Sequence, residues 1–219
     1  MKLVLLLGIA VAITAAAPRD WSRTVVNTAI GWRTGQAAAP LKLVEYASLN
    51  CSHCAHFSQA ADEQIMAQVK TGRVQFEYRP YLIFPHDVAA TLVVRCIPTS
   101  HRFAFIQDYY RNSEAITERL RGAMADATRR AALDAAKVQG VGAFNRQVVA
   151  VTGMGTLAAR HGLTPVAANR CVADPAGLSW LQKTQAAAKA AGVSGTPTYR
   201  LNGQPLNVRS PEQLLAALK

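Results

Sequence analysis

The chain has 219 residues, half of them hydrophobic, and carries a formal net charge of +11 at pH 7. This length and composition are ample for one globular domain, or for one domain with a large insertion. Its cationic residues are scattered and accompany no recognised motif, which excludes nucleic acid as an expected partner and leaves a solvated basic surface or attraction to anionic membranes and acidic clients.

The first 17 residues have the layout of a secretory signal peptide, with Lys2 followed by an unbroken apolar stretch and then by alanines. Cleavage after Ala16 or Ala17 fits this layout. Pro18 is a poor residue just after a cut at Ala17, so an uncleaved membrane anchor is the alternative. No later apolar run approaches the roughly 18 residues of a membrane-spanning helix. We therefore expect export to an oxidising compartment, where disulfides persist.

Residues 18–84 combine alternating strand patterns with one helical pattern. Strands are predicted at 23–27, 31–35, 41–47 and 73–81. A helix begins at Ser52 and ends before Gly72, with an apolar stripe made of Phe57, Ala61, Ile65 and Val69. The order strand, helix, strand predicts a parallel pair with a right-handed crossover.

The rest of the chain is first helical and then mixed. Residues 85–175 are helical in pattern over almost their whole length, and Asn112 and Ser113 are expected to cap a long helix there. Residues 176–219 then give a helix at 176–191, strands at 196–201 and 204–209 around an Asn-Gly turn, and a final helix capped by Ser210. The pattern predicts an α/β sheet domain, formed by 18–84 and 176–219, with an all-helical insertion at 85–175.

Four cysteines follow the signal segment, an even number that favours pairing in an exported chain. Three connectivities are possible. Cys51 and Cys54 are the natural local pair, which leaves Cys96 with Cys171 as a structural disulfide across the helical block. Closing a loop of that length is worth roughly 4 kcal/mol in the chain-entropy model. The alternative is that Cys96 and Cys171 are two buried free thiols.

The segment LNCSHCAHFSQ, residues 49–59, places the local pair where a strand ends and a helix begins. Unpaired N–H groups at a helix start stabilise a thiolate, so the pKa of Cys51 is expected to fall. His53, between the sulfurs, can add a donor or a positive charge, and Cys54 points back toward the sheet. Cys51 is therefore the predicted nucleophile and Cys54 the resolving thiol.

The energy of such a pKa shift favours reduction of the Cys51–Cys54 disulfide. Lowering a thiol pKa by about 3 units stabilises the reduced form by roughly 4 kcal/mol and raises the reduction potential by about 90 mV. The pair would then act as an oxidant and transfer its disulfide to a substrate. Two alternatives remain: half of a zinc site that uses His53 and His56, and a Cys51–Cys54 disulfide with a purely structural role.

Three segments, LVEYASLNCSHCAHF, EYRPYLIFPHDVAATLVVRC and GVSGTPTY, resemble the exported DsbA-like thiol:disulfide oxidoreductases of bacteria, and the likeness covers about 21–219. The resemblance implies a thioredoxin fold with a helical insertion, an active-site disulfide, a cis-proline loop that faces it and re-oxidation by a quinone-linked membrane partner. It also implies a periplasmic location. Ser52 departs from the proline that strong oxidants of the family often carry before the histidine, which leaves the balance of oxidase and isomerase activity open.

The resemblance also implies roles for three further residues. Thr196 and Pro197 match the cis-proline loop, in which the ring lies against the sulfurs, the Thr196 backbone pairs with an extended client and its hydroxyl tunes the sulfur. A trans proline opening a strand is the alternative. Glu45 matches a buried acid that relays protons beneath the resolving cysteine, although its spacing alone allows it to face solvent.

The sequence thus predicts a monomeric exported oxidoreductase that passes its disulfide to reduced secreted client proteins through a mixed disulfide. No cofactor or metal is expected. A reductase or isomerase of the same fold, and a non-catalytic Cys/His metal-binding protein, are the alternatives.

Overall fold

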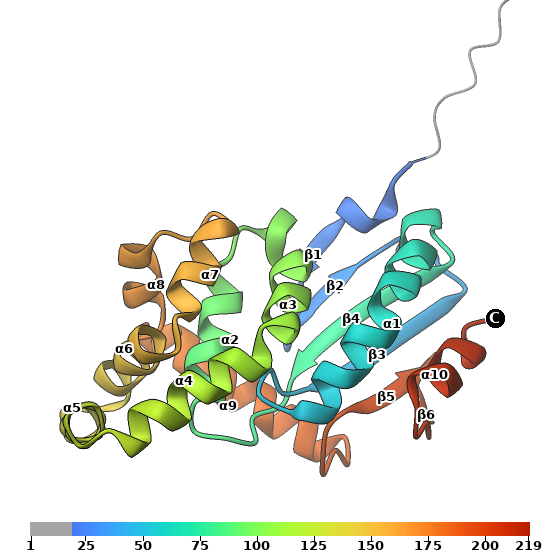
Figure 1. Cartoon of the computed structure of the whole chain (residues 1–219). Coiled ribbons are helices and arrows are strands. Elements are labelled where there is room, and N and C mark those ends of the chain that lie inside the picture. The colour runs from blue at the N-terminus through green and yellow to red at the C-terminus, as the bar shows by residue number, and fades with distance from the viewer. Residues whose placement is uncertain (1–18) are drawn as a thin grey trace, which may run out of the picture.

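The computed structural model describes residues 19–219, so the predicted signal peptide lies outside the described residues. Six strands form one sheet in the order β1-β2-β4-β3-β5-β6 (Figure 1). Their bounds are Val25–Asn27 (β1), Trp32–Thr34 (β2), Leu41–Ala47 (β3), Val74–Pro80 (β4), Thr198–Leu201 (β5) and Gln204–Leu206 (β6). Strands β3 and β4 are parallel, and the other pairs in the sheet are antiparallel.

Helix α1 (Ser52–Thr71) makes the predicted crossover between β3 and β4. Alternation along β3 separates its side chains between two layers. Leu43 and Ala47 pack in the same core cluster as the α1 residues Cys54, Ile65 and Val69. Tyr46 instead packs on the other face, with Ala188 and Val193. Glu45 shares its face with Leu43 and Ala47, so β3 directs its carboxyl group toward α1.

Seven helices separate β4 from the C-terminal part of the chain, in agreement with the predicted helical block (Figure 1). Their bounds are Asp87–Cys96 (α2), Arg102–Arg111 (α3), Ser113–Ala125 (α4), Ala127–Gln139 (α5), Val141–Thr152 (α6), Met154–Arg160 (α7) and Pro165–Cys171 (α8). Two short 3-10 turns lie outside these helices: Trp21–Arg23 (η1) before β1 and Thr99–His101 (η2) between α2 and α3. Helix α9 (Pro175–Ala190) contacts both α2 and β4, and α10 (Pro211–Ala217) packs on α1. The exact division at 85 and 175 stays a prediction.

Local details differ from the sequence-based expectations in two places. The side chains of Asn112 and Ser113 donate to carbonyl oxygens of Asp108 and Tyr110, so they cap the end of α3 and not the start of α4. All the predicted strands except 41–47 are two or three residues shorter than expected, including those at 196–201 and 204–209. A proline has no N–H to give to a ladder, and the Arg209 backbone N–H donates to Gln213 in α10, so both ends leave the sheet.

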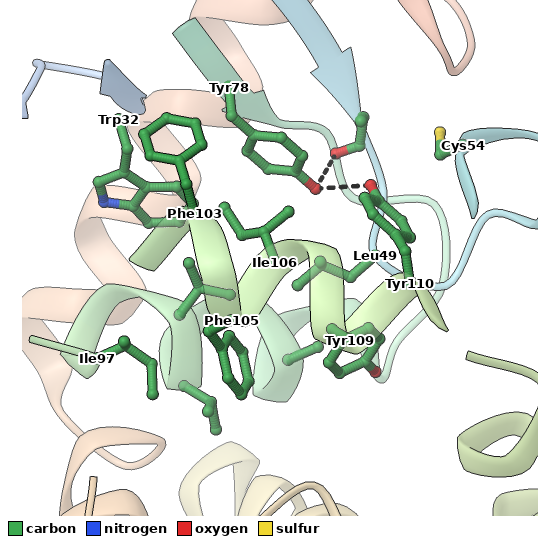
Figure 2. Close-up of a cluster of buried hydrophobic side chains, with 14 of the residues drawn as sticks. Trp32, Leu49, Cys54, Tyr78, Ile97, Phe103, Phe105, Ile106, Tyr109 and Tyr110 are labelled. Atoms are coloured by element: carbon green, nitrogen blue, oxygen red, sulfur yellow. Dashed lines mark hydrogen bonds between the residues drawn. The ribbon is translucent and has the colours of Figure 1, made fainter. Parts of the chain in front are cut away.

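Aromatic side chains join the sheet to the helical block (Figure 2). The hydroxyl groups of Tyr78 from β4 and Tyr110 from α3 are hydrogen bonded to each other at 3.0 Å. The Tyr78 hydroxyl also lies 3.3 Å from the Ala47 carbonyl oxygen and the Tyr110 hydroxyl lies 3.1 Å from the Ser48 carbonyl oxygen, so the two phenol protons are shared among these three contacts. These bonds fix the chain immediately after β3, in the segment that leads to Cys51.

A disulfide joins Cys96 at the end of α2 to Cys171 at the end of α8, with their Cα atoms 6.3 Å apart. None of the helices in residues 19–219 combines the length and the hydropathy needed to span a bilayer.

Candidate active site

A fully buried carboxylate, Asp87, organises the loop that precedes Cys51. It accepts hydrogen bonds from the Ser48 hydroxyl at 2.8 Å and the Asn50 amide at 2.7 Å. It also accepts from the backbone N–H groups of Ile83 and Phe84 at 2.7 and 2.8 Å. Four donors compensate the burial of the charge. Asp87 therefore ties the 48–50 loop to the loop after β4, and the sequence signalled it only as an acid in the first turn of α2.

Cys51 is the N-cap residue of α1, and its thiol is partly exposed. Its sulfur accepts a hydrogen bond from the Cys54 backbone N–H at 3.4 Å and lies 3.5 Å from the Thr196 carbonyl oxygen. The Thr196–Pro197 peptide bond is cis. The fold thus brings a loop 145 residues away in sequence against the sulfur.

The pKa of Cys51 is lowered from 9.0 to about 5. The largest cause is the hydrogen bond from the Cys54 thiol, and partial burial opposes it. Thr196 and the backbone N–H groups of Cys54 and His53 lower the pKa further. The helix start thus supplies donors to the thiolate, as expected from the sequence.

Cys54 has the opposite environment, because its side chain is fully buried between α1 and the sheet. Burial raises the pKa of its thiol strongly, and the neighbouring Cys51 sulfur and the Glu45 charge raise it further. Both cysteines carry free thiols in this structure. The pair therefore consists of one sulfur that ionises readily and one that holds its proton.

Glu45 is 4% exposed and accepts a hydrogen bond from the Tyr199 hydroxyl at 3.1 Å. Burial raises the pKa of this carboxyl group, and the charges of Asp62 and Cys51 raise it further. The Glu45 charge in turn raises the pKa of Cys54. Sequence reasoning missed Tyr199 because it lies 154 positions away and meets Glu45 only through the β3–β5 pairing.

The two histidines of the segment lie on the exposed side of α1. For His53, the backbone N–H is the group that lowers the pKa of Cys51, so the tuning role of its imidazole stays a prediction. Over residues 19–219, the structure gathers no group of three or more His, Cys, Asp or Glu side chains able to hold a metal ion.

Thiolate absorbance at 240 nm in the reduced protein is expected to titrate with a midpoint near pH 5, because the thiol of Cys51 has a pKa of about 5. Cys51→Ser should remove this transition. Cys54→Ala, which leaves no donor in this position, should move it toward higher pH, because the hydrogen bond from the Cys54 thiol is the main cause that lowers the Cys51 pKa. A wild-type midpoint above pH 8, the range of an ordinary thiol, would contradict the assignment.

Comparisons with known proteins agree with this geometry. A family model described as thioredoxin matches residues 28–219, and no curated protein matches the chain. A protein-disulfide isomerase from Novosphingobium aromaticivorans is 26% identical, with a TM-score of 0.71 over 85% of this chain and 96% of the other.

Two more distant structures share the fold. Wolbachia pipientis alpha-DsbA1 is 16% identical, with a TM-score of 0.66 and coverage of 86% and 88% of the two chains. MdbA, a thiol-disulfide oxidoreductase from Actinomyces oris, is also 16% identical, with a TM-score of 0.63 and coverage of 94% and 93%.

Proposed function

This chain belongs to the thioredoxin family, has the fold of DsbA-like thiol-disulfide oxidoreductases, and, we propose, donates a Cys51–Cys54 disulfide to reduced client proteins after export. The observation that carries this proposal is the contrast between the two sulfurs at the start of α1. Cys51 is accessible with a lowered pKa, and Cys54 is fully buried with a raised pKa. Dithiol–disulfide exchange needs this division between an attacked sulfur and a leaving sulfur.

The proposed reaction has two exchange steps. A client thiolate attacks the Cys51 sulfur of the oxidised pair, the Cys51–Cys54 bond breaks, and the electron pair leaves on Cys54, which takes up a proton. A second client thiolate then attacks the client sulfur of the mixed disulfide. Cys51 leaves as the stabilised thiolate, and the client has lost two electrons to the pair.

Glu45 is the proposed proton donor to Cys54. It lies on the face of β3 that points toward α1, and its raised pKa keeps a proton available in this buried place. Cys54 needs this proton because a thiolate without solvent would be unstable. When the pair is re-oxidised, Glu45 would take the proton back.

Client binding is proposed to use the cis-proline loop. Its Thr196 carbonyl lies beside the Cys51 sulfur, and an extended peptide could pair with this backbone as an added strand. The buried Thr196 hydroxyl has no hydrogen-bond partner among the described residues, so we propose that it donates to the Cys51 thiolate. A cavity of about 550 Å³, lined in part by Cys51, lies between α1 and α4 and has space for client side chains.

The partners and the compartment belong to the same proposal. We propose reduced secreted proteins as clients, a quinone-linked membrane oxidase as the partner that restores the disulfide, a monomeric state and a periplasmic location. A second candidate is isomerase activity, because the 26% identical structure from Novosphingobium aromaticivorans is described as a protein-disulfide isomerase.

The equilibrium potential against glutathione separates an oxidant from a reductase of the same fold. A fall in the Cys51 pKa from 9.0 to about 5 corresponds to about 5 kcal/mol, which partial solvent exposure reduces. This energy favours the reduced form, so we expect a potential well above the roughly −270 mV of thioredoxin. A value close to that of thioredoxin would support a reductase instead.

The pH dependence of this potential follows from the same two thiols. The pKa of Cys51 is lowered from 9.0 to about 5. Its thiolate therefore stabilises the reduced form fully above pH 9, and this stabilisation is lost as the pH falls through 5. Between these values the reduced pair holds one proton, on Cys54. The potential should therefore fall by about 30 mV per pH unit there, and by about 60 mV per unit below pH 5.

A further inference from the structure

Helix α1 carries a line of three reactive or polar side chains, each one turn after the previous one: Cys54, Ser58 and Asp62. Residues four apart lie on the same face of a helix. Cys54 is fully buried, Ser58 is 7% exposed and Asp62 is partly exposed. The line therefore runs from the proposed resolving sulfur toward solvent, along the side of α1 that faces the core.

The outer two members of this line are directly connected. The Ser58 hydroxyl donates a hydrogen bond to the Asp62 carboxylate. Asp62 also lines a cavity of about 740 Å³ between α1 and α3, whose other lining residues are Ser58, Gln59, Glu63, Met66, Gln107 and Arg111. Because most of this lining is polar or charged, the cavity suits water.

Asp62 and Glu45 influence each other electrostatically. Burial raises the pKa of Asp62, whereas its hydrogen bond with Ser58 and the charge of Arg111 lower it. The Asp62 charge in turn raises the pKa of Glu45. Two carboxyl groups that interact in this way titrate as a pair, so the protonation of one depends on that of the other.

The other titratable groups around this pair come from four elements. They are the thiols of Cys51 and Cys54 on α1, Tyr78 on β4, Tyr110 on α3 and Tyr199 on β5. Burial raises the pKa of all three tyrosines, which therefore stay protonated at neutral pH. Among these groups, the two carboxyl groups and the cysteines are therefore the ones left to exchange protons near neutral pH.

We infer that Asp62, linked through Ser58, is the solvent end of a proton route that serves Glu45 and Cys54. When Cys54 leaves as a thiolate, it takes a proton from Glu45, and Asp62 replaces that proton from water in the cavity. When Cys54 attacks, the proton moves in the reverse direction. Asp62 acts through Glu45 and is thus a supporting residue of the proposed reaction. The inference rests on the proposed function.

The test follows closure of a mixed disulfide between Cys51 and glutathione, formed by mixing the reduced protein with oxidised glutathione. In this step Cys54 must lose its proton. Quenched-flow trapping with a maleimide of known mass separates the mixed disulfide from the closed disulfide between pH 5 and 9. The variants are Asp62→Asn and Ser58→Ala, with Glu63→Gln as the matched control, an exposed neighbour that lines the same cavity.

We expect Asp62→Asn to slow closure by about tenfold or more, within the range that general acid–base catalysis supplies. Its pH midpoint should also move to lower pH, because Glu45 loses a negative neighbour that raises its pKa. Ser58→Ala should slow closure as well. Glu63→Gln should match the wild type, and attack by Cys51 on glutathione should be unchanged in all three variants.

Glu45→Gln, measured in parallel, separates the two hypotheses. If Glu45→Gln slows closure while Asp62→Asn keeps both the wild-type rate and the wild-type midpoint, the route through Asp62 is wrong and the role of Glu45 stands. If Glu45→Gln has no effect, the proposed proton donor is itself wrong, and the inference fails with it.

Discussion

Cys51→Ala is expected to reduce disulfide transfer to a reduced test protein to the uncatalysed rate. Cys51 is the partly exposed sulfur and has the lowered pKa, whereas Cys54 is fully buried and cannot be reached by a client thiolate. Cys54→Ala should also transfer no disulfide, because it lacks the second sulfur needed to hold one. Supplied instead with the test protein in its disulfide form, this variant should form a covalent complex through Cys51, and no Cys54 thiol is present to resolve it. The measurement is recovery of the test protein's activity, with non-reducing electrophoresis to detect a covalent complex.

The control for this experiment is the Cys96→Ala/Cys171→Ala double variant, which removes the other two cysteines and should transfer disulfides at the wild-type rate. Two results would contradict the assignment of roles. One is a Cys51→Ala variant that still oxidises the test protein. The other is a Cys54→Ala variant that forms no covalent complex with the disulfide form of the test protein while the wild type exchanges disulfides with it.

The same double variant is expected to lose roughly 4 kcal/mol of unfolding free energy. The bond between Cys96 and Cys171 joins residues 75 positions apart, so it removes much of the conformational entropy of the unfolded helical block. For a chain of this size that loss lowers the melting temperature by about 10 °C. Urea unfolding without reductant, with both proteins carrying Cys51→Ala and Cys54→Ala, measures the difference.

Single variants separate the cross-link from the side chains. Cys96→Ala removes the bond and one sulfur, and the further change at Cys171, which is 5% exposed, then adds only the cost of a small buried group. Most of the loss should therefore appear in the single variant. A double variant as stable as the wild type would show that this bond contributes nothing to stability.

The two thiols differ because of where α1 begins. Cys51 precedes the first turn, where the Cys54 thiol and then the free backbone N–H groups of the helix start donate to its sulfur, and Cys54 lies one turn inside, against the sheet. This contrast is the physical basis of the proposed direction of transfer. It needs no metal or cofactor, because the electron pair moves between sulfur atoms.

Asp87 shows how the fold holds this arrangement in place. Its carboxylate is buried and accepts hydrogen bonds from the loop before Cys51 and from the loop after β4. Asn50 in turn accepts a hydrogen bond from Tyr109 on α3 at 3.0 Å. The helical block thus contributes to the position of the Cys51 loop, although its residues make no exchange chemistry themselves.

Local features of the sequence determined the elements and part of the site. The 3.6-residue stripe from Phe57 to Val69, and the alternation in 41–47, predicted α1 and β3 with the bounds that the structure has. The spacing of Cys51 and Cys54 placed one sulfur at the helix start and the other one turn inside. These properties depend on residues within one turn or one strand, so a sequence pattern carries them directly.

Tertiary structure alone decided the contacts between distant segments. The sequence could name Thr196 and Glu45 only through a resemblance, whereas folding set the Thr196 carbonyl beside Cys51 and the Tyr199 hydroxyl on Glu45. It also brought Asp87 under the active-site loop and Asp62 to the edge of a cavity. Such contacts join residues far apart in the chain, and burial in a shared core, which no local pattern records, determines their pKa values.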